Sequence, residues 1–274
     1  MKPQIGFLAL ITILATFSTP LPVNWKTPLS TPKASAQIQD ARKAEAQRLL
    51  QQGIQQFQTS QFEAALQSWQ QALIIFRESK DRQNEAAALA NLGNAYQALG
   101  NYSKTIEYLQ QALAITRSIG DHQNEGKALG SLGLAYYSLG DYTKSVDYSQ
   151  QFLTIARSTR DRQGEGGALN NLGLAYDSLG DYAKAIKYYE QALAIDREIH
   201  DRQGEGKALG NLGNAYDSLG DYAKAIEYQQ QWLVIARSIK DRQSEGNALT
   251  NLGLAYNSLG YYAKAIEYFE QHLV

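Results

Sequence analysis

The sequence predicts an all-α protein, built as a right-handed solenoid of helical hairpins. Three observations lead to this class: the chain repeats itself with a period of forty, each copy spaces its apolar residues as a helix does, and all five prolines lie at or before Pro32. Self-similarity with a period of about 20 to 50 residues is typical of proteins in which each unit packs only on its neighbours. The period of the repeat is therefore the main evidence for the fold.

The first 36 residues differ from the repeats. Lys2 precedes a short apolar run at 5–17, and an A-x-A motif ends at Ala36. A basic start, a short apolar segment and such a motif are typical of a secretory signal peptide. We therefore predict a signal peptide at 1–36 and an exported mature chain at 37–274, in the periplasm, the cell envelope or outside the cell. An uncleaved anchor is the alternative, although a membrane span needs ~20 apolar residues, and we expect none in the mature chain.

Six units of the repeat follow one another without a gap, and the last is incomplete. They cover residues 41–80, 81–120, 121–160, 161–200, 201–240 and 241–274. The fourth and fifth units agree at 29 of 40 positions, whereas the first is the most diverged. Position 1 of the repeat is Asp81, Asp121, Asp161, Asp201 and Asp241 in units two to six.

The first helix of each unit is expected to begin just after position 1. Asp is a good N-cap there, and Glu at position 5 lies where the helix dipole favours an anion. Ala, Leu, Leu, Ala, Tyr and Leu recur at positions 8, 9, 12, 15, 16 and 19 of units two to six, which is the spacing of one helical face. Gly at position 20 should end the helix. Gly at position 13 should let the two helices of a unit approach closely.

The second helix is expected to begin near the Tyr at position 22 and to end near the next unit's Asp. It carries Ile or Val at position 26, Tyr at 28 and Leu at 33, with Ile at 35 in the complete units. One hairpin cannot bury this apolar face alone, so the units must stack.

Composition argues against most chemistries. The net charge is −1, which implies no nucleic-acid partner, and there is no Cys for a disulfide, a thiolate metal site or a nucleophile. The three His residues are scattered, and the carboxylates recur with every unit, as caps and solvated groups do. The stretch GEGKALG at 204–210 lacks the first Gly and the Ser or Thr of a phosphate-binding loop. We therefore expect no enzyme activity, no cofactor and no metal.

These units resemble the tetratricopeptide repeat, and the resemblance covers 41–274. In the fourth unit its pattern of small and large residues is met by Leu172, Gly173, Tyr176, Ala185, Tyr189 and Ala192. Leu169 replaces the usual Trp, and Arg197 replaces the usual late Pro. Each unit is also longer than the roughly 34 residues common in the family. Units of this length look most like Pins-type adaptors, kinesin light chains and exported bacterial arrays, which are often joined to a caspase-like (CHAT) domain.

The residues that vary between copies lie at positions 7, 10, 14 and 17, opposite the packing face. The resemblance implies that this stripe lines a concave groove that binds a peptide, and we expect the stripe to have no packing role. Position 11 adds a row of amides beside it, which can bond a peptide backbone. The predicted groove residues are Asn94, Lys127, Tyr137, Asn170, Asn171, Asp177, Lys207, Asn211, Asn214, Asp217, Asn247 and Asn257. A solvated face without function is the alternative for any one of them.

The function predicted from the sequence is a scaffold that binds a protein or peptide in this groove. The carboxylate clamp of chaperone-binding relatives is incomplete, because Asn171 and Lys207 match it but Gly130 and Leu134 do not. One alternative is the sensing part of a larger effector that continues beyond Val274. Another is a structural envelope protein that self-associates through its C-terminal end, where Tyr262 and Ile266 would lack a covering helix.

Overall fold

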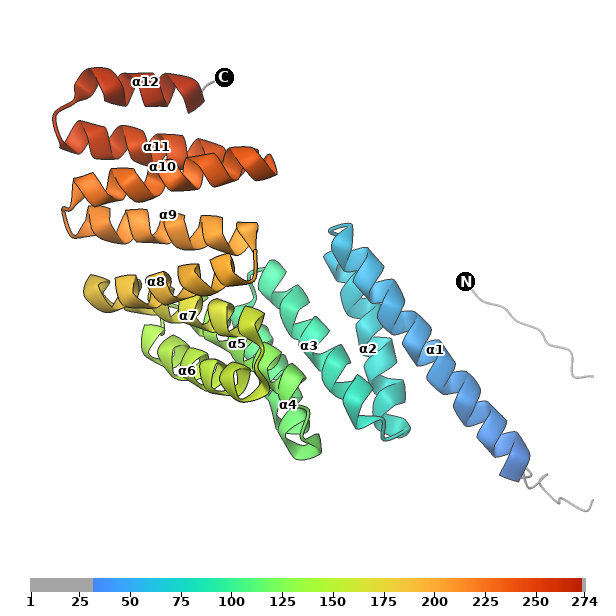
Figure 1. Ribbon diagram of the computed structural model, residues 1–274. Coiled ribbons are helices and arrows are strands. Elements are labelled where there is room, and N and C mark those ends of the chain that lie inside the picture. Colours follow the sequence, from blue (N-terminus) through green and yellow to red (C-terminus); the bar gives the residue numbers. More distant parts are fainter. Residues whose placement is uncertain (1–31, 273–274) are drawn as a thin grey trace, which may run out of the picture.

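The computed structural model describes residues 32–272, and over this range it contains twelve α-helices and no strand (Figure 1). The helices form six consecutive hairpins, so the predicted all-α class and the hairpin architecture are confirmed. The hairpins are α1 (Pro32–Gln58) with α2 (Phe62–Glu78), α3 (Arg82–Ala98) with α4 (Tyr102–Ile119), α5 (His122–Ser138) with α6 (Tyr142–Thr159), α7 (Arg162–Ser178) with α8 (Tyr182–Glu198), α9 (Arg202–Ser218) with α10 (Tyr222–Ile239), and α11 (Arg242–Ser258) with α12 (Tyr262–His272).

The first helix is longer than the repeat predicts. It begins at Pro32, upstream of residue 41, where the first unit was expected to start. Residues 36–45 of α1 are exposed. Most of the predicted signal peptide lies outside the described residues, and its predicted cleavage point after Ala36 lies within α1.

The helix ends follow the predicted caps. The Asp81 side chain accepts a hydrogen bond from the Asn84 backbone N–H, and the Asp161 side chain accepts one from that of Gly164. The Gly residues at position 20 are left-handed, with φ from +72° in unit two to +80° in unit six. Leu at position 19 is the C-cap just before this turn, and its side chain is 41 to 52% exposed in units two to six. Leu at position 19 was expected on the packing face, and this was wrong, because the residue lies at the exposed end of the helix beside the turn.

The two helices of a unit cross at the Gly of position 13, as predicted. A Cβ atom added to Gly93 would lie 2.8 Å from Cγ of Leu109, and one added to Gly253 would lie 2.4 Å from Cε1 of Phe269. Real Cβ atoms do not come this close to a neighbour, so any larger residue would push the helices apart.

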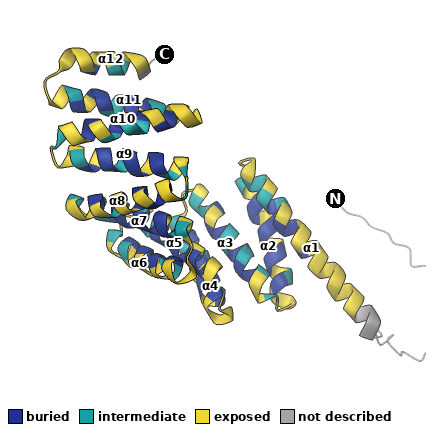
Figure 2. Ribbon diagram, in the orientation of Figure 1, coloured by how far each residue is buried: buried dark blue, intermediate teal, exposed yellow. Residues whose placement is uncertain are grey.

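Neighbouring units stack in one curved array. Within residues 32–272 the backbone of each first helix approaches that of the first helix of the next unit, whereas successive second helices meet through long side chains, as Arg77 Nη2 on α2 donates to Gln111 Oε1 on α4 at 2.9 Å. The first helices α3, α5, α7, α9 and α11 therefore lie on the inner side of the curve, and the second helices lie on its outer side (Figure 1). Buried residues run between the two layers along the whole array (Figure 2). None of the helices in this range has the length and hydropathy of a membrane span.

Candidate functional site

The predicted groove residues all belong to the first helices. The structure therefore brings them to the inner side of the array, spread over α3, α5, α7, α9 and α11. Those at positions 7 and 14 are exposed: Asn94, Lys127, Lys207, Asn214 and Asn247. A partner that follows the curve would meet these side chains one unit after another.

The amides of adjacent units bond to one another. The Asn211 Nδ2 donates to Asn170 Oδ1 at 2.9 Å, and the Asn251 Nδ2 donates to Asn214 Oδ1 at 2.9 Å. Asn214 Oδ1 also accepts from Nε2 of Gln229, a residue of the second helix that is 1% exposed. The predicted row of amides exists, but part of its hydrogen-bonding capacity joins the units. The role of Gln229 could not be predicted, because its position is Leu, Ser, Tyr or Phe in units two, three, four and six.

Position 10 of the variable stripe and position 11 beside it have packing roles in some units, which corrects the expectation that the stripe has none. Asn171 is only 9% exposed, so its side chain belongs to the packed layer. Position 10 is buried as Gly130 and Gly210, which lie against aromatic rings of the second helix. A Cβ atom at Gly130 would be 2.9 Å from Phe152 Cε1, and one at Gly210 would be 3.0 Å from Cδ2 of Trp232.

Position 17 carries polar side chains that differ in burial from unit to unit. The Ser178 hydroxyl donates to the Tyr137 hydroxyl at 3.1 Å, which links units three and four. Burial raises the pKa of the adjacent Asp177, whose Oδ1 atom has no hydrogen-bond partner. Desolvation also raises the pKa of Asp217, and both Asp217 and Asn257 at the same position lie on the exposed part of their helices.

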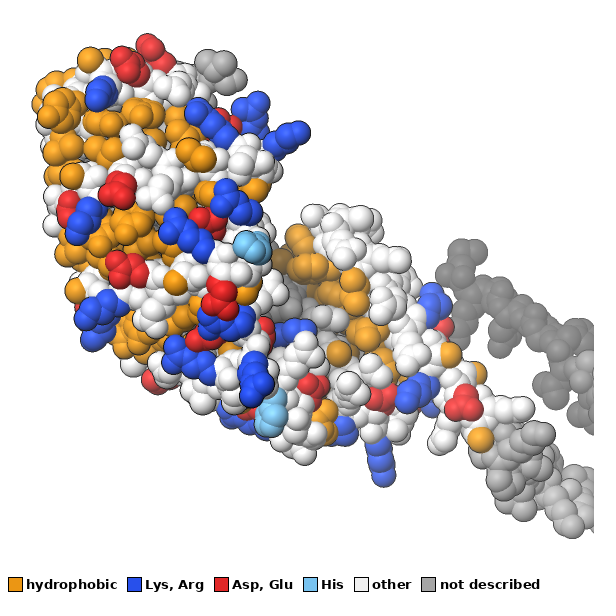
Figure 3. Space-filling view, viewed as in Figure 1, with side chains coloured by type: hydrophobic (Ala, Val, Ile, Leu, Met, Phe, Trp, Pro, Cys, Tyr) orange, Lys and Arg blue, Asp and Glu red, His pale blue; other side chains and the backbone are white. Residues whose placement is uncertain are grey.

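The inner side thus carries both signs of charge, with lysines at position 7 and acids at position 17. The same mixture is visible on the face drawn in Figure 3, where basic and acidic side chains alternate along the array and apolar side chains lie between them. A partner of strongly one-sided charge is therefore not favoured over the whole length of the array. Preferences for charge should instead be local.

A hollow opens on the inner side between units two and three. Its volume is about 200 Å³, and its lining comes from α3, α4 and α5. Alanines make up much of its apolar part, namely Ala86, Ala87, Ala90, Ala112 and Ala128. Its polar lining includes Asn91, Asn94 and Lys127, and it contains no carboxylate.

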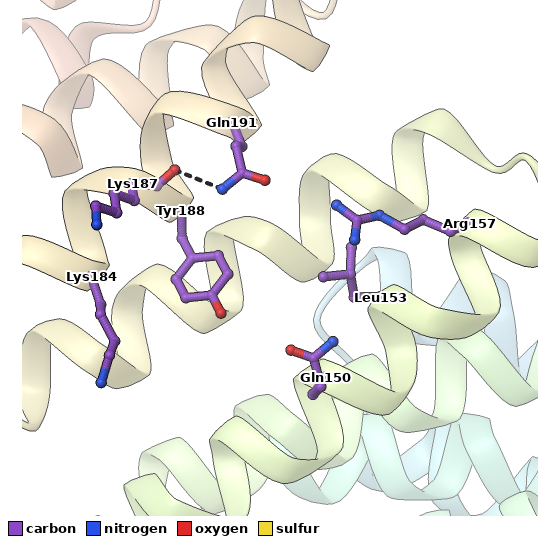
Figure 4. Close-up of a pocket in the computed structure, with 7 residues that line it drawn as sticks. All are labelled: Gln150, Leu153, Arg157, Lys184, Lys187, Tyr188 and Gln191. Atoms are coloured by element: carbon purple, nitrogen blue, oxygen red, sulfur yellow. Dashed lines mark hydrogen bonds between the residues drawn. The ribbon is translucent and has the colours of Figure 1, made fainter.

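The outer side carries a second hollow of about 350 Å³, between α6 and α8 (Figure 4). Two of its three cations already have partners, because Arg157 pairs with Glu165 at 2.8 Å and Lys184 pairs with Asp181 at 2.7 Å. This hollow is therefore a weaker candidate for anion binding than its composition suggests. It is lined by Gln150, Leu153, Arg157, Lys184, Lys187, Tyr188 and Gln191.

Two repeated contacts hold the scaffold together, and the sequence did not predict either. Within each of units two to six, Lys at position 24 lies over the Tyr ring at position 16, at 4.7 to 5.2 Å from its centroid. Between units, Glu at position 5 pairs with the Arg at position 37 of the preceding unit, as Glu205 does with Arg197 at 2.9 Å. These contacts fix the frame on which the inner surface is carried.

The described residues show no sign of a metal centre. Between residues 32 and 272 no three His, Asp or Glu side chains are arranged so that they could hold a metal ion.

The sequence matches one protein-family model. The tetratricopeptide repeat model matches five overlapping stretches, at residues 45–118, 85–158, 124–198, 165–238 and 205–273. No curated protein matches the chain significantly.

Several solved structures share the fold. The signal transduction ATPase with numerous domains of Pyrococcus horikoshii, which has a tetratricopeptide repeat sensor, matches with a TM-score of 0.72 and 21% identity over 86% of this chain and 37% of that one. A Rap protein complexed with competence and sporulation factor matches with a TM-score of 0.64 and 18% identity, over 84% and 74%. TPR-like repeats of a putative Podosopora anserina kinesin light chain match with a TM-score of 0.58 and 23% identity, over 68% and 92%. At these identities the likeness shows the fold alone.

Proposed function

The chain belongs to the tetratricopeptide repeat family, and on this premise we propose that it is a scaffold that binds a protein or peptide segment along its inner side. The fold of this family is generally a non-catalytic platform for protein binding. The bound segment would lie across α3, α5, α7, α9 and α11, in contact with the exposed side chains at positions 7 and 14.

One observation carries this proposal. The residues that hold the units together repeat almost unchanged, whereas the exposed residues of the inner side differ from unit to unit. Position 7 is Ala87, Lys127, Gly167, Lys207 and Asn247 in turn. A rigid frame with a different side chain at each step suits an extended ligand with a sequence of its own, because each step can recognise a different group.

The chemistry of the surface supports a peptide. Amides supply both donors and acceptors, so they can bond a peptide backbone whatever its side chains. The Rap protein, which shares the fold, was solved with competence and sporulation factor bound. Its likeness supports a ligand for this chain without identifying it.

A selection experiment tests the proposal. The full chain would be immobilised and used to select binders from a displayed library of random short peptides. Selected peptides should bind in solution and should be displaced by one another, because they share one surface. If no peptide is enriched over a control selection on an unrelated helical protein, the proposal fails.

The other predictions of the sequence stay predictions. Export is tested by N-terminal sequencing of the protein from the producing cell, which should begin at Gln37; a sequence beginning at Met1 would contradict it. A role as the sensor of a larger effector and self-association through the C-terminal end are also untested. Sedimentation at a series of concentrations would measure self-association directly.

A further inference from the structure

We propose that the hollow on the outer side between α6 and α8 is a binding site for a small organic carboxylate (Figure 4). Its volume of about 350 Å³ lies at the lower end of the roughly 300 to 1,000 Å³ that is usual for pockets of small molecules. The site lies away from the inner side, so it does not depend on the proposed function. The equivalent places between the other units show why this one should bind a ligand.

The first difference is a missing bridge between units three and four. At the other four junctions within residues 32–272, Nη2 of the Arg at position 37 donates to the Gln side chain at position 31 of the next unit. These bonds are 2.9, 2.8, 3.0 and 3.4 Å long in Arg77–Gln111, Arg117–Gln151, Arg197–Gln231 and Arg237–Gln271. Arg157 and Gln191 make no such bond and stand on the two walls of the hollow (Figure 4). Arg157 Nη2 therefore has no partner among the described residues and can donate to a ligand.

The second difference is the charge at position 27, on the wall that α8 provides. Unit four has Lys187 there, whereas units two, three, five and six have the acids Glu107, Asp147, Glu227 and Glu267. With Lys at this position, no carboxylate lines the hollow. Arg157 and Lys184 already pair with Glu165 and Asp181, but no acid in the described part of the chain pairs with Lys187. The hollow thus offers a ligand one unpaired positive charge.

One unpaired charge favours a carboxylate over a phosphate group. A singly charged carboxylate would accept a hydrogen bond from Arg157 Nη2 and attract the ammonium group of Lys187, whose flexible stem lets it turn toward the ligand. A phosphate group carries nearly two negative charges, so one of them would stay uncompensated.

The rest of the lining suits a ligand with a short apolar body. Leu153, which is 3% exposed, and the half-buried ring of Tyr188 form the apolar part of the hollow. An aromatic ring or a short aliphatic chain attached to the carboxylate would lie against these two side chains. The amide of Gln150 offers a further donor on the α6 wall.

Fluorine NMR with three probes tests the site. The probes are 4-fluorophenylacetate, the neutral 4-fluorophenylacetamide and 4-fluorophenyl phosphate, which share an aromatic ring and differ in charge. At millimolar concentration the fluorine line of the carboxylate should broaden in the presence of the full chain. Titrations should give the carboxylate a lower Kd than the amide and the phosphate, because only the carboxylate matches the single unpaired charge.

Variants locate the binding. Lys187→Asp copies position 27 of unit three and should weaken carboxylate binding about tenfold, because an acid replaces the unpaired cation. Lys127→Asp makes the same change in charge on the inner side, and its affinity should stay within about twofold of the wild type. Both lysines are exposed, so neither substitution should unfold the chain.

An exchange of residues separates the open junction from charge alone. Lys187→Asp with Asp147→Lys exchanges position 27 between units three and four and keeps the net charge of the wild type. The bond of Arg117 to Gln151 closes the outer side where the new lysine lies, between units two and three. The exchanged variant should therefore bind the carboxylate as weakly as Lys187→Asp does.

Four outcomes would overturn the inference. They are no binding of the carboxylate at millimolar concentration, binding of the amide or the phosphate at least as tight as that of the carboxylate, equal affinities of Lys187→Asp and Lys127→Asp, and recovery of binding in the exchanged variant. The first would mean that the hollow holds only water, and the last that a surface lysine suffices without an open junction. The peptide selection is a separate measurement, so none of these outcomes decides the proposed function.

Discussion

Tyr189 lies directly against the backbone of Gly173, so that a Cβ atom added to this glycine would be 2.4 Å from Cε1 of the ring. Tyr189 is 1% exposed and belongs to the buried cluster between units four and five. Because Gly173 has no side chain, the ring of Tyr189 can fill the space beside its backbone. In every unit the residue at position 29 packs against the Gly at position 13 in the same way, although the residue at position 29 differs from unit to unit.

Gly173→Ala should lower the free energy of unfolding by about 1 to 3 kcal/mol, because overpacking forces the two helices apart. A urea titration followed by circular dichroism measures the change. Gly167→Ala is the matched control in the same helix, where the added Cβ would be 3.9 Å from Phe152 and the residue is exposed. It should stabilise the chain by up to about 1 kcal/mol through helix propensity. Equal effects of the two substitutions would contradict the packing.

The ion pair of Glu165 should contribute to stability at neutral pH. Burial acts to raise the pKa of Glu165, but hydrogen bonds from Arg157 and Arg162 outweigh it and hold the pKa below its usual value. Its contribution is therefore present above the unfolded pKa, near 4.5, and is lost as the pH falls through the lower folded value. Glu165→Gln should cost about 1 to 3 kcal/mol at pH 7.

The loss should shrink when the unfolding titration of Glu165→Gln is repeated near pH 3.5. Glu227→Gln, an exposed acid on α10, serves as the control and should stay within about 0.5 kcal/mol of the wild type. A deficit of Glu165→Gln that is the same at both pH values would show that the side chain acts by packing and not by its charge.

Asp196 should have the opposite effect. It is 8% exposed, and burial, followed by the charges of Asp201 and Glu205, raises its pKa to about 6, although Lys207 lowers it. Because the folded pKa exceeds the unfolded value of 3.8, the folded state binds the proton more tightly, and stability should rise as the pH falls from about 6 to about 4.

Asp196→Asn should therefore stabilise the chain at pH 7, by about 1 to 2 kcal/mol, since water screens part of the effect of the raised pKa. Melting curves at pH 7 and pH 4 measure the difference, which should nearly vanish at the lower pH. Glu190→Gln, exposed on the same helix, is the control. A destabilised Asp196→Asn at pH 7 would mean that the carboxylate is held by a favourable interaction.

The fold could be predicted because the same sequence pattern recurs in every unit. The Asp cap, the Gly of position 13 and the Gly of position 20 have local or short-range causes, and the structure places all three as expected. Position 10 could not be interpreted correctly from one helix, because Gly130 varies to accommodate Phe152 on the other helix and not to meet a ligand. Packing against the second helix is thus one cause of variation between copies, and only the structure reveals it.

The candidate site was predicted only in part for the same reason. Exposure of Lys127 and Lys207 follows from helical periodicity, whereas the burial of Asn171 depends on how closely the next unit packs. The hollow beside Ala112 is lined by residues of α3, α4 and α5, and such a lining becomes visible only when the helices are placed in space.

The charges of the inner side should control binding without affecting the fold. Lys127 and Lys207 are exposed on α5 and α9, so Lys127→Glu with Lys207→Glu should change the unfolding free energy by no more than about 0.5 kcal/mol per site. Acidic peptides selected on the wild type should bind the double variant at least tenfold more weakly, and the remaining binding should depend less on salt.

Lys187→Glu with Lys240→Glu makes the same change in net charge at exposed sites away from the inner side, and the affinity of this control variant for the same peptides should stay within twofold of the wild type. Calorimetric titration at two salt concentrations measures both. If the two double variants weaken binding equally, net charge rather than the inner surface governs recognition, and if the first unfolds, its lysines are packing residues.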